Sequence, residues 1–272
     1  MQGKYYSTKV RPNIPPSSQH VGVYTVKDVL FGWTAVQIPR GSARLISATA
    51  IVRGKGDANG TANPFAMDLW FADDDRNALA TSSAVTNAAI AGIPSRDILG
   101  NVSLEVAGYT ELGDNNTMQC VTSRHTSSDV GDYGEPVDFQ FGSSIDNLVI
   151  TPKMTLDVNA SPTVTGYTTF YMGGIAQGAF DWSTINLIND DDIAATSPGT
   201  TLVMDGASMD IREHFTAGDT LHAADDAVIG TVDSITNSTT LELEDSIATS
   251  VLAANDPVYN INPVEIVLAF EY

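Results

Sequence analysis

Three acidic segments carry the residue types that bind calcium ions in proteins. In the first, Asp73, Asp75 and Asn77 take alternate positions, as in the opening of a calcium loop. The segment departs from the EF-hand pattern, because Ala78 stands where glycine is required and Ala84 where a bidentate glutamate is required. Two interpretations remain: a looser Ca²⁺ site built from separate loops, or a solvated acidic loop. The same two interpretations hold for residues 189–192 and 225–226.

No motif in the sequence indicates nucleophilic, nucleotide-dependent or zinc-dependent catalysis. The four histidines lack the HxH and HExxH spacings of metal ligands, and no GxSxG, GxGxxG or Walker A motif occurs. His125 lies in a segment rich in Ser and Thr, but a catalytic triad cannot be read from scattered residues. Cys120 is the single cysteine, which excludes an intrachain disulfide, and we interpret it as a buried thiol. We therefore expect no enzyme activity and no cofactor, with a Ca²⁺ ion as the one exception to test.

Four large aromatic residues could form a flat platform for a sugar ring: Trp33, Trp70, Phe180 and Trp182. Aromatic residues of this size are more often part of the core of a β-protein, where each buries a large apolar area. We favour the core interpretation and keep the sugar platform as the alternative.

The charge of the chain restricts its partners. With 33 acidic and 13 basic residues, the formal net charge is -20. Such a surface repels nucleic acid and anionic membranes, so we expect neither as a partner. It also favours solubility at high ionic strength, although an ordinary acidic soluble protein has the same composition. No apolar run reaches the ~20 residues of a membrane span, and residues 1–20 lack the apolar core of a signal peptide. We expect assembly in a host cytoplasm.

The elements that must position these residues are strands. Short segments rich in β-branched and aromatic residues alternate with turn formers, which is typical of an antiparallel β-sandwich or jelly roll. The Ala-rich segment 79–91 is the one helix that the sequence suggests. The expected strands cover residues 21–31, 43–52, 66–71, 102–106, 118–122, 137–141, 148–150, 154–158 and 167–172.

The final segment has the clearest strand pattern in the chain. Val264, Ile266, Leu268, Phe270 and Tyr272 share one face, because side chains of a strand alternate with a period of two. A strand this apolar must be paired inside a sheet, since an exposed apolar edge promotes aggregation. The segment that precedes it, residues 215–259, is therefore an insertion between the main body and its own last strand.

The insertion has a repeating pattern of short strands and turns. Gly218 and Asp219 form an expected turn, residues 228–235 an expected strand, and residues 237–238 a hairpin turn before the alternating residues 239–243. Residues 251–252 and 257–259 complete it. Five short strands in about 45 residues predict a small SH3-like barrel.

The pattern GD-x-L, IG-x-V-x-S-I, T-x-L-x-L and NDPVY in this insertion resembles modules of tailed-bacteriophage virion structural proteins. The resemblance covers about a sixth of the chain. It implies a particle component of the capsid decoration or cement type, carrying a module that projects from the surface or makes contacts.

We thus predict an all-β protein in three parts: an extended N-terminal arm (1–20), a β-sandwich, jelly-roll-like body (21–214 with 260–272) and the inserted barrel (215–259). The prolines of the arm disfavour helix. The arm is either a frayed terminus or an extension that lies on a neighbouring subunit. In the second case, the subunit contacts are made by Tyr5, Tyr6, Pro12, Pro15 and Pro16.

The function that these observations favour is a non-enzymatic virion protein that stabilises a phage head through subunit contacts. We expect a homo-oligomer, a trimer at capsid symmetry axes, with the major capsid protein and other virion proteins as partners. One alternative is a tail, fibre or baseplate component that binds a host surface. Another is a glycan-binding or carbohydrate-active β-sandwich protein that depends on calcium.

Overall fold

The structure is a computed structural model. It describes residues 5–19, 23–39, 43–52, 64–73, 75, 79, 98–111, 119–123, 149–150, 167–181, 187–188, 199–204, 210–247, 252 and 256–272. The expected strands at 137–141 and 154–158, and the expected helix 79–91 except Leu79, lie outside these residues. His20, Asn77, His125, Trp182 and residues 189–192 also lie outside them.

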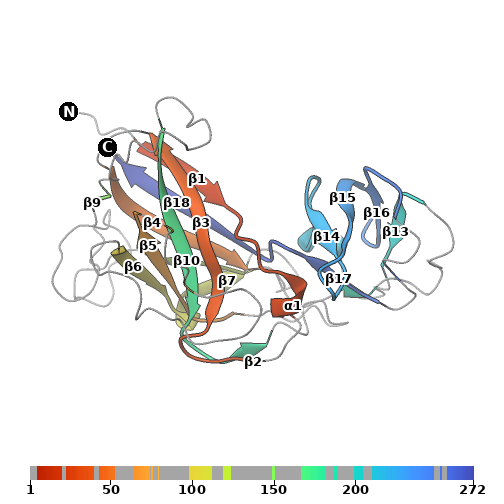
Figure 1. Ribbon diagram of the computed structural model, residues 1–272, viewed down its shortest axis with the longest axis horizontal. Helices are drawn as coiled ribbons and strands as arrows, with labels where there is room; N and C mark the ends of the chain where they lie inside the picture. The colour runs from red at the N-terminus through yellow and green to blue at the C-terminus, as the bar shows by residue number, and fades with distance from the viewer. Residues whose placement is uncertain are drawn as a thin grey trace.

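The fold is all-β with antiparallel sheets, as the sequence predicts (Figure 1). The described residues include one short α-helix, α1 (Pro16–Gln19), and 3₁₀ turns at Val106–Gly108 and Ile211–Glu213. The strands are β1 (Tyr5–Val10), β2 (Val23–Tyr24), β3 (Val29–Pro39), β4 (Ala43–Val52), β5 (Met67–Ala72), β6 (Ile98–Leu104), β7 (Tyr109–Glu111), β8 (Gln119–Ser123), β9 (Val149–Ile150), β10 (Tyr167–Ala176), β11 (Phe180–Asp181), β12 (Leu187–Ile188), β13 (Thr201–Val203), β14 (Thr220–His222), β15 (Val228–Ile235), β16 (Thr240–Leu243), β17 (Pro257–Asn260) and β18 (Val264–Glu271).

Two sheets form the larger part of the molecule, which we call the sandwich. One sheet has the order β1-β18-β4-β8-β7, with β9 also paired to β4, and the other has the order β3-β10-β5-β6. Their inner faces share one apolar core. Phe170 on β10 is central to it, because its ring lies 6.0 Å from that of Phe71 in its own sheet and 5.9 Å from that of Phe270 in the other. Aromatic contacts at these distances join the two sheets.

The last strand, β18, shows the predicted alternation. Val264, Ile266, Leu268 and Phe270 are buried, and the residues between them are half-buried. The strand pairs with β1 on one side and β4 on the other. It is therefore an interior strand of its sheet, which explains why so apolar a segment does not expose an edge.

The N-terminal segment, predicted as an extended arm, begins with a strand of the sandwich. Tyr5–Val10 forms β1 and pairs along its whole length with β18 of the same chain, from Tyr5 opposite Glu271 to Val10 opposite Ile266. The pairing gives the backbone of the segment hydrogen-bond partners within the chain. Proline has no backbone N–H, so the proline-bearing residues that follow leave the sheet.

A second group of strands forms the smaller part of the molecule, which we call the small module and which spans residues 187–260. Its sheet has the order β12-β17-β14-β15-β16-β13, and it has its own apolar core, separate from that of the sandwich. The sheet includes β12 and β13, which precede residue 215, the first residue of the predicted insertion. Figure 1 shows the small module beside one end of the sandwich, with β17 leading directly into β18.

The turns of the small module follow the sequence prediction. At Gly218, φ is +88°, a value that glycine adopts without strain, and the Asp219 amide donates to the Thr216 carbonyl. At the tip of the β15–β16 hairpin, the side chain of Asn237 accepts from the amides of Thr239 and Thr240. The jelly-roll and SH3-like details of the two modules stay predictions.

Candidate functional site at the junction of the two modules

The structure places two of the three predicted calcium ligands. Asp73 follows β5 and is half-buried, and Asp75 is exposed. Among the described residues, no three His, Cys, Asp or Glu side chains lie close enough together to hold a metal ion. The calcium site stays a prediction.

The structure describes the side chains of two residues of the predicted aromatic platform, Trp33 and Trp70. Gly173 on β10 pairs with Trp70 on β5, and the ring of Trp33 lies beside it. The side chain of Leu79, which is fully buried, occupies the space directly over Gly173. Trp33 and Trp70 are half-buried around this contact. Neither residue belongs to the apolar core clusters of the described residues, so the core and the sugar-platform interpretations both stay predictions.

The predicted subunit-contact residues are used largely within the chain. Pro12 and Pro16 are buried, Pro15 is half-buried, and Tyr6 packs on the sandwich core, with its ring 6.3 Å from that of Tyr167. Tyr5 differs, because 71% of its surface is exposed. Of these five residues, Tyr5 alone presents a large free surface for another subunit.

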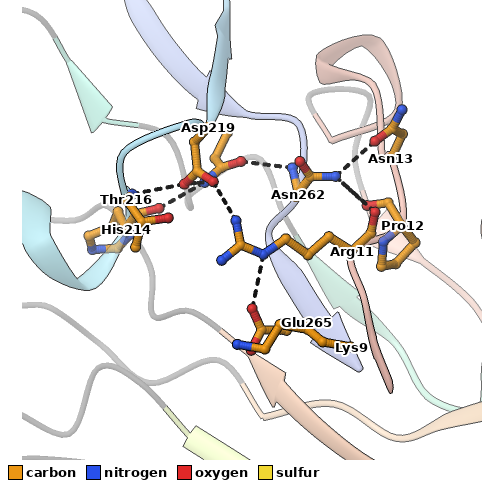
Figure 2. A network of polar contacts seen from close by, with 10 residues as sticks. Lys9, Arg11, Pro12, Asn13, His214, Thr216, Asp219, Asn262 and Glu265 are labelled. Atoms are coloured by element: carbon orange, nitrogen blue, oxygen red, sulfur yellow. Dashed lines mark hydrogen bonds and ion pairs between the residues drawn. The ribbon is translucent and has the colours of Figure 1, made fainter. Parts of the chain in front are cut away.

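The residues that follow β1 meet the small module in a network of polar contacts. Figure 2 shows Arg11 between carboxylates of the two modules: its Nη1 lies 2.8 Å from Asp219 Oδ1, and its Nε lies 3.0 Å from Glu265 Oε2. Glu265, on β18, also pairs with Lys9 Nζ at 2.7 Å. Arg11 thus joins the sandwich to the small module by two charge-assisted hydrogen bonds.

The Asp219 carboxylate is the most buried group of this network. Only 1% of its side chain is exposed. Besides Arg11, it accepts hydrogen bonds from the Thr216 amide and from Asn260 Nδ2, each at 2.9 Å. A buried carboxylate needs this kind of compensation, because removal from water strongly disfavours the ion.

Two asparagines hold the chain where it passes from β17 to β18. Asn260 Nδ2 also donates to the His214 carbonyl at 2.9 Å, and Asn260 Oδ1 accepts from the Asn262 amide at 2.8 Å. Asn262 Nδ2 contacts the carbonyl oxygens of Arg11 and Pro12 at 3.1 Å and Asn13 Oδ1 at 2.8 Å. The connection between the modules is thereby tied to the N-terminal segment (Figure 2).

The same N-terminal segment continues along the small module as far as α1. The Ile14 amide donates to the Ile261 carbonyl at 2.7 Å, and the Ser17 amide donates to Asp226 Oδ1 at 2.8 Å. Gln19 is buried, and its Nε2 donates to the carbonyls of Ile14 and Asn260. Residues 11–19 therefore contact the connection and the small module at several separate points.

The surroundings shift the titration of Glu265. Burial alone raises its pKa, but the hydrogen bonds and charges of Lys9 and Arg11 outweigh burial, so its pKa lies below the ordinary value of a glutamate. The carboxylate is therefore held in its charged form, which keeps both ion pairs intact at neutral pH.

Two buried histidines lie on the small-module side of the junction. His222 Nδ1 lies 2.9 Å from the Asp226 carbonyl, so this nitrogen carries the hydrogen, since a carbonyl oxygen only accepts. Asp226 has a φ of +69° and holds the Ser17 amide through its side chain. The His214 carbonyl accepts from Asn260. The histidines thus support the turns that carry the junction.

A different buried carboxylate lies in the sandwich. Asp68 on β5 accepts from Ser103 Oγ at 2.6 Å and from Gln177 Nε2. Burial raises the pKa of Asp68, and these two hydrogen bonds only partly offset the effect. The partners of Asp68 are neutral, whereas those of Glu265 are cationic, and this explains the opposite directions of the two shifts.

The described groups of the junction bind one another. Sequence reasoning missed it because Arg11 and Asp219 are 208 residues apart. Two signals were available: Asp219 stands in a Gly-Asp turn, and Glu265 places a charge on the other face of β18.

Comparisons with family models and with curated proteins give no match from which a function could be inferred. No protein-family model matches the sequence, and no curated protein matches it. Within the described part of the chain, no helix has the length and apolar character needed to span a bilayer.

Proposed function

We propose that the protein is a non-enzymatic structural component of a tailed-phage virion, a capsid decoration or cement protein that stabilises the head through subunit contacts. The observation that carries the proposal is the two-module, all-β architecture, in which the small module is held against the sandwich by the Arg11–Asp219–Glu265 network. A module held in this way presents a fixed surface to neighbouring subunits. In this proposal the small module is the SH3-like barrel and the sandwich is of the jelly-roll type.

The surface of the protein supports a role in a particle. A net charge of -20 keeps free subunits apart in solution, so that assembly depends on specific contacts. Strand β1 lies at an edge of its sheet and exposes Tyr5, which makes this edge a contact point for a neighbouring subunit. We propose a homotrimer on the outside of the capsid, with the major capsid protein as its partner.

Two measurements test the proposal. Light scattering on the purified protein should give a trimer mass, and mass spectrometry of purified phage particles should find the protein in many copies. Cryo-electron microscopy of the same particles then separates a position on the head from one on the tail. Absence from purified particles would refute the proposal, and a tail position would favour the host-binding alternative. Ca²⁺-dependent binding on a glycan array would favour the glycan-binding alternative.

A further inference from the structure

We propose that residues 11–19, which we call the strap, lock the orientation of the small module on the sandwich, and that the Arg11–Asp219 ion pair is the main contact of this lock. The inference goes beyond the proposed function, because it concerns motion between the modules of one chain and holds wherever the protein acts. None of the strap residues belongs to the apolar core of the small module, and Ile14 belongs to that of the sandwich. The strap nevertheless contacts the small module, the connection to β18 and β18 itself.

The charge distribution makes Arg11 decisive for this contact. Residues 187–260 contain 14 acidic residues and one basic residue, Arg212, for a formal charge of -13. Arg212 is already bound to Asp210 through its Nε and Nη2. The buried Asp219 therefore receives its positive partner from the N-terminal segment, outside the module. Without Arg11, a carboxylate that is 1% exposed loses this ion pair, while the neutral donors of Thr216 and Asn260 remain.

The position of the strap suits a lock. The chain passes between the modules at two places, from β11 to β12 and over the short stretch from Asn260 to Val264. The strap runs beside it and is bound to it at Ile261 and Asn262. Its far end is bound to the small module at Asp226. Contacts of the strap on both sides of this stretch restrict rotation of the small module relative to the sandwich.

The lock responds to charge, because its contacts at both ends use carboxylates. The titratable and charged groups that face it are Lys9 and Glu265 from the sandwich, and His214, Asp219, His222 and Asp226 from the small module. Both ends of the strap thus depend on acidic side chains of the small module.

The test measures a distance between the modules directly. Spin labels are placed at Thr110→Cys in the sandwich and Ser234→Cys in the small module, both exposed, in a Cys120→Ser background. Pulsed electron resonance of the full chain at neutral pH should give one narrow distance distribution. Arg11→Gln should broaden it severalfold, and the double variant Arg11→Gln with Asp219→Asn should stay broad, because it also lacks the ion pair.

Two further variants give the test its controls. Arg212→Gln removes the exposed ion pair inside the small module and should leave the distribution narrow. Asp226→Gly releases the far end of the strap while suiting the positive φ at this residue, and should broaden the distribution less than Arg11→Gln.

Hydrogen exchange separates unlocking from unfolding. In Arg11→Gln, the amides of Ile14 and Ser17 should exchange about tenfold faster, while those of β14, β15 and β16 keep their protection. A distribution as narrow as that of the parent protein in both Arg11→Gln and Asp226→Gly overturns the proposal. Loss of protection throughout the small module in Arg11→Gln also overturns it, because Arg11 then serves the fold of that module and not its orientation.

Discussion

The sandwich and the small module are stabilised in different ways. The sandwich uses long paired strands, up to the 11 residues of β3, and an aromatic contact between its two sheets at Phe170. In the small module the longest strand has 8 residues, and side-chain hydrogen bonds at Asp219 and Asn237 shape its turns. A short-stranded sheet buries less per strand, so turn geometry contributes more to its stability.

The junction differs from both cores. The two apolar clusters are separate, whereas the contacts that join the modules at the junction are mainly hydrogen bonds and ion pairs. Apolar packing is therefore local to each module, and polar geometry sets how the modules are arranged. The comparison predicts that core substitutions act on one module, whereas junction substitutions act on the arrangement of the two.

The largest expected effect comes from the aromatic contact of the sandwich. Phe170→Ala should lower the free energy of unfolding of the sandwich by about 3–5 kcal/mol, because it leaves a cavity between the sheets. Leu241→Ala is the matched change in the core of the small module and should cost about 2–5 kcal/mol there. Differential scanning calorimetry should show two unfolding transitions. Phe170→Ala should lower the melting temperature of one transition, and Leu241→Ala should lower that of the other. A single transition that both substitutions lower equally would contradict the separation of the cores.

A smaller effect should come from adding volume to the sandwich. A Cβ at Gly174 on β10 would collide with the ring of Phe31, so Gly174→Ala should cost about 1–3 kcal/mol. Gly178→Ala is the control, since nothing lies within 4 Å of its Cβ position. Urea denaturation followed by tryptophan fluorescence measures both. Equal midpoints for the two variants would show that Phe31 moves aside without cost.

At the junction, Asn260 offers a neutral test of polar geometry. Asn260→Ala removes donors from the His214 carbonyl and from Asp219, both buried, and should cost about 1–3 kcal/mol. Asn237→Ala, in the exposed hairpin turn, should cost about 0.5–1 kcal/mol and leave the junction unchanged. Amide exchange at Asn262, whose amide donates to Asn260, should rise in the first variant and not in the second.

The sequence could predict the all-β class and several strands, because side-chain alternation reports burial on one face. Residues 43–52 and the last strand, β18, are the clearest cases. It could not predict β1, since YYSTKV shows no apolar alternation and becomes a strand only by pairing with β18. The 11-residue β3 was also missed beyond Phe31, because Gly32, Thr34 and Gln37 interrupt its apolar pattern.

The contacts of the junction could not be predicted from the sequence for the same physical reason. Hydrogen bonds between residues more than 200 positions apart follow from how two modules pack, and local patterns carry no information on that packing. The predicted calcium ligands and the SH3-like and jelly-roll details remain predictions. The prolines of the predicted arm, either a frayed terminus or a subunit contact, include Pro12 and Pro16, which are buried.

The smallest expected effect is a pH dependence of opposite sign in two carboxylates. The pKa of Glu265 is lowered, so its charged form stabilises the fold above the ordinary pKa of a glutamate, and this contribution is lost as the pH falls through the lowered value. The pKa of Asp68 is raised, so its neutral form is favoured, and the contribution of this residue to stability is lost as the pH rises through the raised value.

Glu265→Gln should therefore destabilise the protein at neutral pH and have no effect on stability in acid. Asp68→Asn should become more favourable, relative to the parent, as the pH rises. Urea midpoints from about pH 3 to about pH 7 measure both slopes. If the urea midpoints of the two variants changed with pH in the same direction, cationic partners at Glu265 and neutral partners at Asp68 would not have opposite effects. The electrostatic difference between the junction and the sandwich would then be contradicted.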